Sequence, residues 1–306
     1  MKVSMGSKAL IGLYGIEGGI KMLADAGFEA VDYPLYAETI TPWNESFFRD
    51  PSIKEFGDHF RCTAKVIADH GLELFQSHAP YCEPNCSAPE AYALNLQQTI
   101  QAIYASGYME CPNIVAHPVL HPDFHNGQNR ERAIQTNLEF FGKMAPALKD
   151  TGVTMCIENL FWGERGKPKI ANACSDADQL IALVDALNDR YGPYYAVCLD
   201  SGHAVVSGND PSQMLKALGQ RTRVLHVHDN KGVKDDHLMP GVGVINWKEF
   251  LPAINAVCYS GTFNMEIDFR DYQKDTYNKE VHQAACKLIY AVGRSMADIA
   301  AGSKNR

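Results

Sequence analysis

The sequence lacks the features that mark several classes of protein. It has no run as long as the roughly 18 apolar residues that a membrane-spanning helix needs, so we expect no membrane span. Its first residues lack an uninterrupted apolar stretch followed by a small-residue cleavage site, so we expect no export signal. The nine cysteines form no CxxC pair, which argues against a zinc knuckle and favours a reduced, cytoplasmic protein.

Signals for binding nucleotides and nucleic acids are also missing. No GxGxxG or GxxxxGK[ST] motif follows an apolar run, which removes the usual nucleotide-binding interpretation. The formal net charge of −8 disfavours a broad basic face for nucleic acid. No linker rich in proline or serine divides the 306 residues, and 46% of them are hydrophobic. We therefore expect a single domain, residues 1–306, with a large core, and the sequence leaves a homo-oligomer open.

Short apolar runs alternate with longer helical patterns along the whole chain. Eight runs are expected strands: Lys2–Met5, Glu29–Tyr33, Leu72–Ser77, Asn113–Ala116, Val153–Ile157, Tyr195–Leu199, Val224–Val227 and Phe263–Ile267. The expected helices are Gly15–Asp25, Ser52–His70, Pro89–Ser106, Glu131–Lys149, Asp176–Arg190, Pro211–Leu218, Trp247–Val257 and Asp275–Ala300. Alternating strands and helices predict right-handed βαβ units and a parallel sheet. Eight such units predict an α/β fold, the (β/α)₈ TIM barrel.

Six consecutive strands each end in a histidine or a carboxylate. The βα loops of a barrel open at the carboxyl ends of the strands, where chemistry collects. Four of the five intervals between these residues span 39–42 positions, which matches one βα unit of nearly constant size. The six residues are His78, His117, Glu158, Asp200, His226 and Glu266.

These residues allow two interpretations. Taken singly, a strand-end histidine is more often a hydrogen-bonded side chain than a ligand, and a strand-end glutamate is usually solvated or ion-paired. Taken together, six converging groups would repel and shift one another's pKa strongly unless a cation compensated them. Mixed imidazole and carboxylate ligands suit Zn²⁺, Mn²⁺, Fe²⁺ or Co²⁺ better than Ca²⁺ or Mg²⁺. The pattern therefore favours a divalent metal site, with Cys156 one layer deeper as core packing.

The segment HVHDNKGVKDDHLMPGVG crowds further imidazoles and carboxylates behind the seventh strand. His226 and His228 alternate along that strand and share a face, so either could be the ligand and the other a contact to substrate or to a ligand. Asp235 and His237 could bring a second ligand cluster over the rim. Pro-Gly-Val-Gly would then turn the chain tightly before a helix that begins near Asn246.

The segments HAPY, AHP, IEN, DSGH, HVHD, DDH, PGVG and MEI, in this order, resemble the xylose isomerase-like TIM-barrel superfamily. This superfamily includes sugar and sugar-phosphate isomerases and epimerases, inosose dehydratase-like proteins and endonuclease IV. The resemblance spans Lys2 to Arg270. Its ordered spacing is specific for the superfamily but does not identify the substrate.

The resemblance to ketose 3-epimerases implies one Mn²⁺-like ion. Its ligands would be Glu158, Asp200, a histidine of the seventh strand and Glu266, with the two glutamates as proton acceptor and donor. The HxxD form of the seventh strand implies His226 as the ligand, whereas the HxH form of the ketose epimerases would favour His228.

The resemblance to endonuclease IV implies a larger, trinuclear zinc set, and Tyr81 stands where that family keeps a tyrosine. The matching ligands are His78, His117, Glu158, Asp200, His203, His226, Asp235, His237 and Glu266. Endonuclease IV carries an arginine in the loop after its second strand, but residues 30–48 contain no Arg or Lys here. Contacts to DNA phosphates need cations, so a nucleic-acid partner is not expected.

Aromatic and basic residues near the strand ends are candidates for binding a carbohydrate. Tyr36 and Trp43 could line a pocket wall with Tyr33, or all three could pack under the loop. Phe161 leaves the same two choices as its neighbour Trp162, and the basic residues are often no more than solvated rim charges. The candidate substrate contacts are His228, Tyr33, Trp162, Lys231 and Arg270.

Three functions compete. The first is a metal-dependent isomerase or epimerase of a sugar, polyol or sugar phosphate, with Glu158, Glu266 and His203 as catalytic residues and one to three Zn²⁺ or Mn²⁺ ions. The second is zinc-dependent cleavage of a phosphodiester at abasic sites in DNA. The third is a barrel that only binds a sugar, which would be expected to lack the two glutamates.

Overall fold

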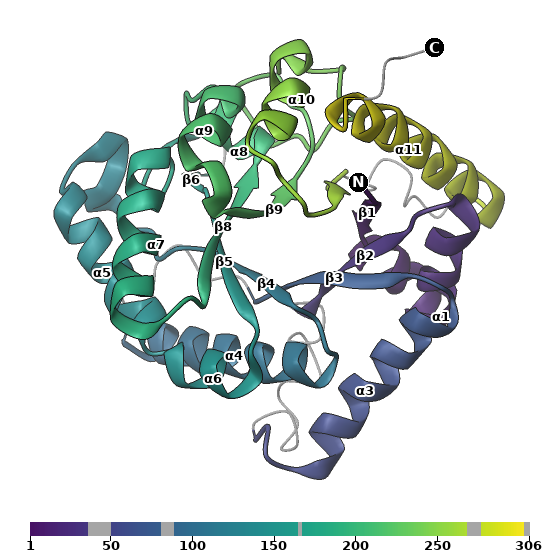
Figure 1. Ribbon diagram of the computed structural model, residues 1–306, viewed down its shortest axis with the longest axis horizontal. Coiled ribbons are helices and arrows are strands. Elements are labelled where there is room, and N and C mark those ends of the chain that lie inside the picture. The colour runs from purple at the N-terminus through teal and green to yellow at the C-terminus, as the bar shows by residue number, and fades with distance from the viewer. Residues whose placement is uncertain (36–49, 81–88, 165–166, 268–276, 303–306) are drawn as a thin grey trace.

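The computed structural model describes residues 1–35, 50–80, 89–164, 167–267 and 277–302. Eight strands form one parallel sheet in the order β10-β1-β2-β3-β4-β5-β8-β9, and helices surround it on the outside (Figure 1). A parallel bridge between Val227 and Met265 joins the two end strands and closes the sheet. The predicted TIM barrel is therefore confirmed. The strands are β1 (Val3–Gly6), β2 (Ala30–Pro34), β3 (Glu73–His78), β4 (Asn113–Ala116), β5 (Thr154–Glu158), β8 (Tyr195–Asp200), β9 (Thr222–His226) and β10 (Phe263–Met265).

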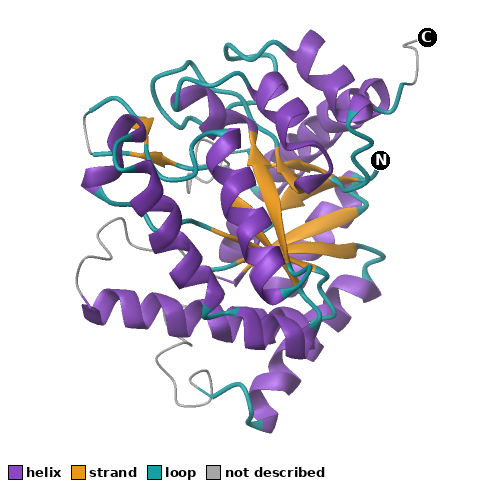
Figure 2. Ribbon diagram, turned by 60° about the vertical axis from the view of Figure 1, so that its left-hand side comes forward, coloured by secondary structure: helices purple, strands orange, loops and turns teal. Residues whose placement is uncertain are grey.

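The strands are continuous buried runs because helices cover the outer face while side chains fill the inside. All six residues of β8 and all five of β2 are buried. Figure 2 shows the strands enclosed by helices when the molecule is turned. Cys156 packs inside the barrel against Val115 and Cys198, as predicted from its distance to Glu158.

The helices lie between successive strands, and their ends follow the local sequence. Asp176 accepts a hydrogen bond from the Gln179 amide at the start of α7, and Asp210 caps α9 in the same way. Gly27 and Gly152 end α1 and α6 in the left-handed region. The helices are α1 (Lys8–Ala26), α3 (Lys54–Asp69), α4 (Pro89–Tyr108), α5 (Arg130–Gly142), α6 (Ala145–Thr151), α7 (Ala177–Tyr191), α8 (Ser201–Val206), α9 (Pro211–Leu218), α10 (Trp247–Ala256) and α11 (Lys279–Ala300).

Several predicted boundaries were wrong. The helix expected from Gly15 already begins at Lys8, with Gly15 at a kink where φ is 69°. The helix expected over residues 131–149 is two helices, because the chain breaks after Gly142 and restarts with Pro146 in the first turn of α6. A two-stranded hairpin of β6 (Phe161–Trp162) and β7 (Ile170–Ala171) was not predicted. Among the described helices, none combines the length and apolar character needed to cross a membrane.

Candidate metal centre at the mouth of the barrel

The strands bring the predicted ligands to one end of the barrel. His78, Glu158, Asp200 and His226 are the last residues of β3, β5, β8 and β9. His117 follows β4 by one residue, and Glu266 follows β10 by one residue. Because all eight strands are parallel, these six side chains converge on the same rim.

Glu158 lies at the centre of this group, with only 1% of its surface exposed. Its Oε1 is 3.0 Å from Nδ1 of His226 and 3.3 Å from Nδ1 of His203. Its Oε2 is 3.0 Å from Nε2 of His117 and 3.4 Å from Nε2 of His78. One carboxylate thus faces four imidazoles, which come from β3, β9, helix α8 and the position just after β4.

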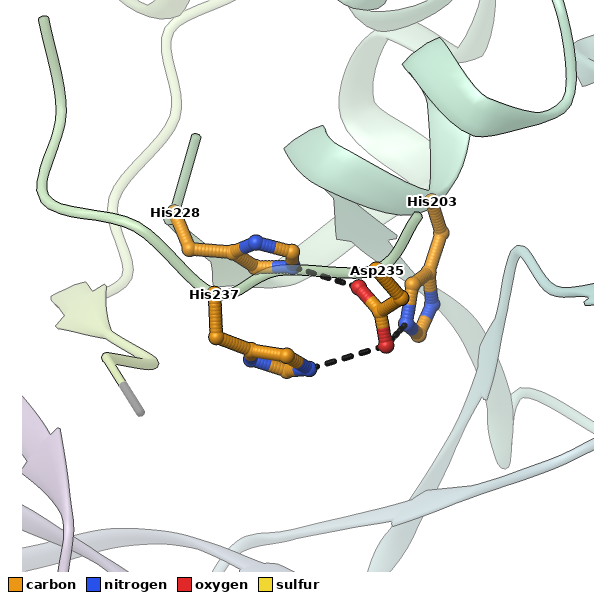
Figure 3. Close-up of side chains that lie close together, drawn as sticks. All are labelled: His203, His228, Asp235 and His237. Carbon is orange, nitrogen blue, oxygen red and sulfur yellow. Dashed lines mark hydrogen bonds and ion pairs between the residues drawn. The ribbon is translucent and has the colours of Figure 1, made fainter. Parts of the chain in front are cut away.

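Ligand atoms of the described residues gather in three groups, each within 4.8 Å. One group is His78, Glu158 and His226; the second is Glu158, Asp200, His226 and Glu266; the third is His203, His228, Asp235 and His237. In the third group Asp235 lies between the three imidazoles (Figure 3). All nine predicted ligands therefore lie at the mouth, eight of them within these groups and His117 beside Glu158.

His226 and His228 occupy different groups, although the alternation of the strand gave both the same face. His226 points to Glu158 and Glu266, whereas Nε2 of His228 lies 3.0 Å from Asp200 and 3.7 Å from Asp235. The ring of His228 stacks on that of His237, with centroids 4.1 Å apart (Figure 3). His228 therefore has the position of a further ligand candidate rather than of an isolated substrate contact.

Burial and close pairing shift the pKa values of these groups. Burial alone would raise the pKa of Glu158, but the imidazoles of His226, His117 and His203 lower it well below its usual range. The pKa of Glu266 is lowered in the same way by His226 and His237. Burial opposes the charged form of the histidines as well. Asp200 and Asp235 nevertheless raise the pKa of His203 well above normal, and Cys198, Glu266 and Glu158 do the same for the pKa of His226. The pKa of His117 is lowered because its burial outweighs Glu158.

Two buried acceptors support the fit of a cation. Oε2 of Glu266 and Oδ1 of Asp235 make no hydrogen bond to any part of the chain that the structure describes. Their nearest imidazole nitrogens are on His226 at 3.1 Å and His228 at 3.7 Å. Buried carboxylate oxygens without donors are costly, and a divalent cation would satisfy them. The mixed nitrogen and oxygen donors fit Zn²⁺ or Mn²⁺.

The loop after β9 is held in place by a buried carboxylate, that of Asp229. Asp229 is fully buried and accepts hydrogen bonds from the backbone of Gly241 and Ile245 and from Nε1 of Trp247. A Cβ at Gly243 would lie 2.2 Å from Oδ1 of Asp229, so only glycine fits there. This explains the Pro-Gly-Val-Gly sequence. The loop folds back over Asp229 and presents Asp235 and His237 to the mouth.

The structure places the predicted substrate contacts unevenly. Tyr33 is 2% exposed and packs in the hydrophobic core. Trp162 is partly buried against Leu120 and Phe124, whereas the ring of Phe161 lies 5.0 Å from that of His203. Lys231 is exposed at the rim. Three further candidates, Tyr36, Trp43 and Tyr81, lie outside the described residues together with Arg270.

Comparison with known proteins identifies the family of this chain. Residues 20–290 match the family described as xylose isomerase-like TIM barrel. The chain belongs to this family. Among its relatives, the protein named Uncharacterized protein y4fM of Sinorhizobium fredii is 23% identical over 299 residues, which cover 90% of this chain and 88% of y4fM. The protein named Uncharacterized protein MJ1311 of Methanocaldococcus jannaschii is 23% identical over 217 residues, 69% of this chain and 70% of MJ1311.

Several solved structures share the fold at low sequence identity. A D-tagatose 3-epimerase-like protein superposes with a TM-score of 0.70 at 18% identity, covering 98% of this chain and 99% of that one. D-psicose 3-epimerase crystallised in the presence of D-fructose gives a TM-score of 0.68 at 14% identity, with 97% and 99% covered. The IolI protein with a bound zinc atom gives 0.67 at 14% identity, with 99% and 98% covered.

Polar residues that the sequence did not single out lie beneath the rim of this xylose isomerase-like barrel. Asp32 of β2 and Gln76 of β3 are buried inside the barrel, and the Gln76 amide nitrogen lies 3.0 Å from both Asp32 Oδ2 and His226 Nε2. Neither residue is the last of its strand, so the search for polar residues at the carboxyl ends of strands did not identify them. The sequence feature that could have identified Asp32 is its carboxylate inside the apolar run AVDYP.

Proposed function

We propose that this protein is a metal-dependent isomerase or epimerase of a sugar or sugar phosphate. The family and the fold it shares with sugar epimerases support this class of substrate. One observation carries the proposal: Glu158 at the end of β5 and Glu266 just after β10 both reach Nδ1 of His226, at 3.0 and 3.1 Å. Two carboxylates that share one imidazole nitrogen are suited to share one cation, Zn²⁺ or Mn²⁺, with Asp200 as a further ligand.

The same two carboxylates are the proposed acid and base. A bound divalent ion supplies Lewis-acid polarisation of a substrate carbonyl and its neighbouring hydroxyl. Glu158 or Glu266 removes the proton from the carbon beside the carbonyl, which gives an enediolate, and the other glutamate, which takes up a proton from water before it acts, returns a proton. The lowered pKa of both residues favours the ionised form that a proton acceptor needs. His203, whose ring lies beside Glu158, is placed to contact a substrate hydroxyl or a second ion.

The test of this proposal measures proton exchange as well as product. Protein purified without metals is loaded with Mn²⁺ or Zn²⁺ and incubated in D₂O with a panel of ketoses, aldoses and their phosphates. We expect NMR to show deuterium entering at the carbon beside the carbonyl of at least one sugar. Glu158→Gln and Glu266→Gln should lose this exchange while keeping the circular dichroism spectrum of the parent protein.

The third ligand group favours a second candidate, a zinc-dependent phosphodiesterase of the endonuclease IV type. His203, Asp235 and His237 would hold an ion that a one-metal epimerase does not need. The net charge of −8 and the uncharged-to-acidic sequence after the second strand oppose DNA binding. An oligonucleotide with one abasic site, assayed beside the sugar panel, separates the two. Nicking without any sugar exchange would refute the epimerase, and a metal content of three rather than one ion per chain would favour the nuclease.

A further inference from the structure

A buried carboxylate lies on the far side of His226 from the proposed metal site. Oδ2 of Asp32 is 3.5 Å from Nε2 of His226. The same oxygen accepts hydrogen bonds from the side-chain amides of Gln76, at 3.0 Å, and Asn264, at 3.2 Å. Asp32 is 5% exposed, so it is enclosed in the barrel beneath the rim. The three neighbours come from β9, β3 and β10 and fix the carboxylate in one place.

An irregularity in the sheet creates this contact. Strands β2 and β3 pair Val31 with Leu74, but the register then shifts, so Asp32 pairs with Gln76 rather than with Phe75. A one-residue shift changes which side chains share a face of the sheet. Here it sets Asp32 and Gln76 side by side inside the barrel, where both reach His226.

The two ring nitrogens of His226 therefore face different environments. Nδ1 lies 3.0 Å from Glu158 and 3.1 Å from Glu266, where the proposed cation would bind. A neutral imidazole binds a metal through the nitrogen that carries no proton, and the other nitrogen then carries the proton. The proton on Nε2 needs an acceptor, and the carboxylate on that side of the ring is Asp32.

Gln76 fits this arrangement only with its amide turned over, because as placed its N–H faces Nε2, and two N–H groups cannot share a contact of 3.0 Å. Its amide nitrogen lies 3.0 Å from Nε2 of His226, while its oxygen has no hydrogen-bond partner within the described part of the chain. Turning the amide over would offer that oxygen to the same ring nitrogen. As placed, Gln76 donates to Asp32 and to an unprotonated Nε2 of His226; turned over, it accepts a hydrogen bond from the protonated Nε2 beside Asp32.

We propose that Asp32 is a positioning residue, which keeps the proton of His226 on Nε2 and so directs Nδ1 to the cation shared with Glu158 and Glu266. This inference rests on the proposed metal-dependent function. Asp32 lies beneath His226 and acts through it. Partners of metal-bound histidines fix the ring and its tautomer, and their loss typically lowers metal affinity about 10–100-fold.

The first test replaces Asp32 by asparagine, which keeps the shape and removes the charge. Affinity for Zn²⁺ and Mn²⁺ is measured by competition with a chromophoric chelator, and circular dichroism checks the fold. We expect Asp32→Asn to bind about 10–100-fold more weakly than the parent protein. Asp185→Asn is the matched control, because it makes the same chemical change at a carboxylate of α7 that pairs with Arg221 and belongs to none of the ligand groups. Its affinity should be unchanged.

A second measurement needs no variant at Asp32. In zinc-loaded parent protein with ¹⁵N-labelled histidine, the ring signals of His226, assigned by their loss in His226→Gln, should show a protonated Nε2 and a metal-bound Nδ1. A metal-bound Nε2 would overturn the inference. The inference would also be overturned if Asp32→Asn bound the metal as tightly as the parent protein while Glu158→Gln bound it more weakly. In that case the proposed metal centre would still stand. If the parent protein binds no ion at all, the proposed function fails together with the inference.

Discussion

Replacing Glu158 by glutamine removes the one charge that the four imidazoles of the mouth share. The carboxylate is almost fully buried and lies 3.0–3.4 Å from four histidine nitrogens. Removing one partner of a buried ionic group typically costs about 3–5 kcal/mol, because the remaining charge is left uncompensated. At 1.4 kcal/mol for each factor of ten, this predicts a loss of about 10²–10⁴-fold in metal affinity. Glutamine has nearly the same shape, so the barrel should still fold.

Isothermal titration of metal-free protein with Zn²⁺ and Mn²⁺ measures this loss. Glu280→Gln provides the matched control, because it makes the same chemical change at an exposed position in the first turn of α11. We expect the control to bind as tightly as the parent protein. If Glu158→Gln also binds within about threefold of the parent, a difference of roughly 0.7 kcal/mol, Glu158 is not a ligand and the convergence of imidazoles around it has another cause.

Three further outcomes are expected. Gly243→Ala should cost about 1–3 kcal/mol in chemical denaturation by crowding Asp229, and should weaken the binding of any ion held by Asp235. Gly202→Ala should alter metal stoichiometry measured by mass spectrometry, because its Cβ would lie 2.0 Å from the ring of His228. Burial opposes the charged form of His237, but Asp235 raises its pKa to about 10. The pair should therefore stabilise metal-free protein fully below about pH 6.5 and lose that contribution as pH rises through about 10. Chemical denaturation at pH 7 and pH 10 measures the contribution of His237 to the free energy of unfolding. An equal contribution at both pH values would contradict this expectation.

The rim residues could be predicted because two simple periodicities combine. A strand in a parallel barrel delivers its last residue to the mouth, and nearly constant βα units repeat that residue about every 40 positions. His78, Glu158 and Asp200 end their strands in the structure, as the sequence indicated. This part of the site needs no knowledge of tertiary contacts.

The remaining features of the site depend on where the strands end. The alternation of a strand gave His226 and His228 one face, but β9 ends at His226. Beyond it, Asp229 exchanges two backbone hydrogen bonds with Leu238, so the chain leaves the sheet and His228 turns toward Asp200. Register shifts are equally invisible in a sequence, since they follow from how neighbouring strands pair. The shift after Val31 is what aligns Asp32 with Gln76.

Glu158 belongs to two of the three ligand groups, with Oε1 facing His226 of both groups and Oε2 facing His78 of one of them. An ion bound by one of these two groups would be stabilised by the same negative charge of Glu158 that would stabilise an ion in the other group. Successive ions would then bind with unequal affinities. The order in which the groups fill would depend on how the charge of the Glu158 carboxylate is shared between the two ions. A metal titration of the intact protein would accordingly depart from the curve of independent sites.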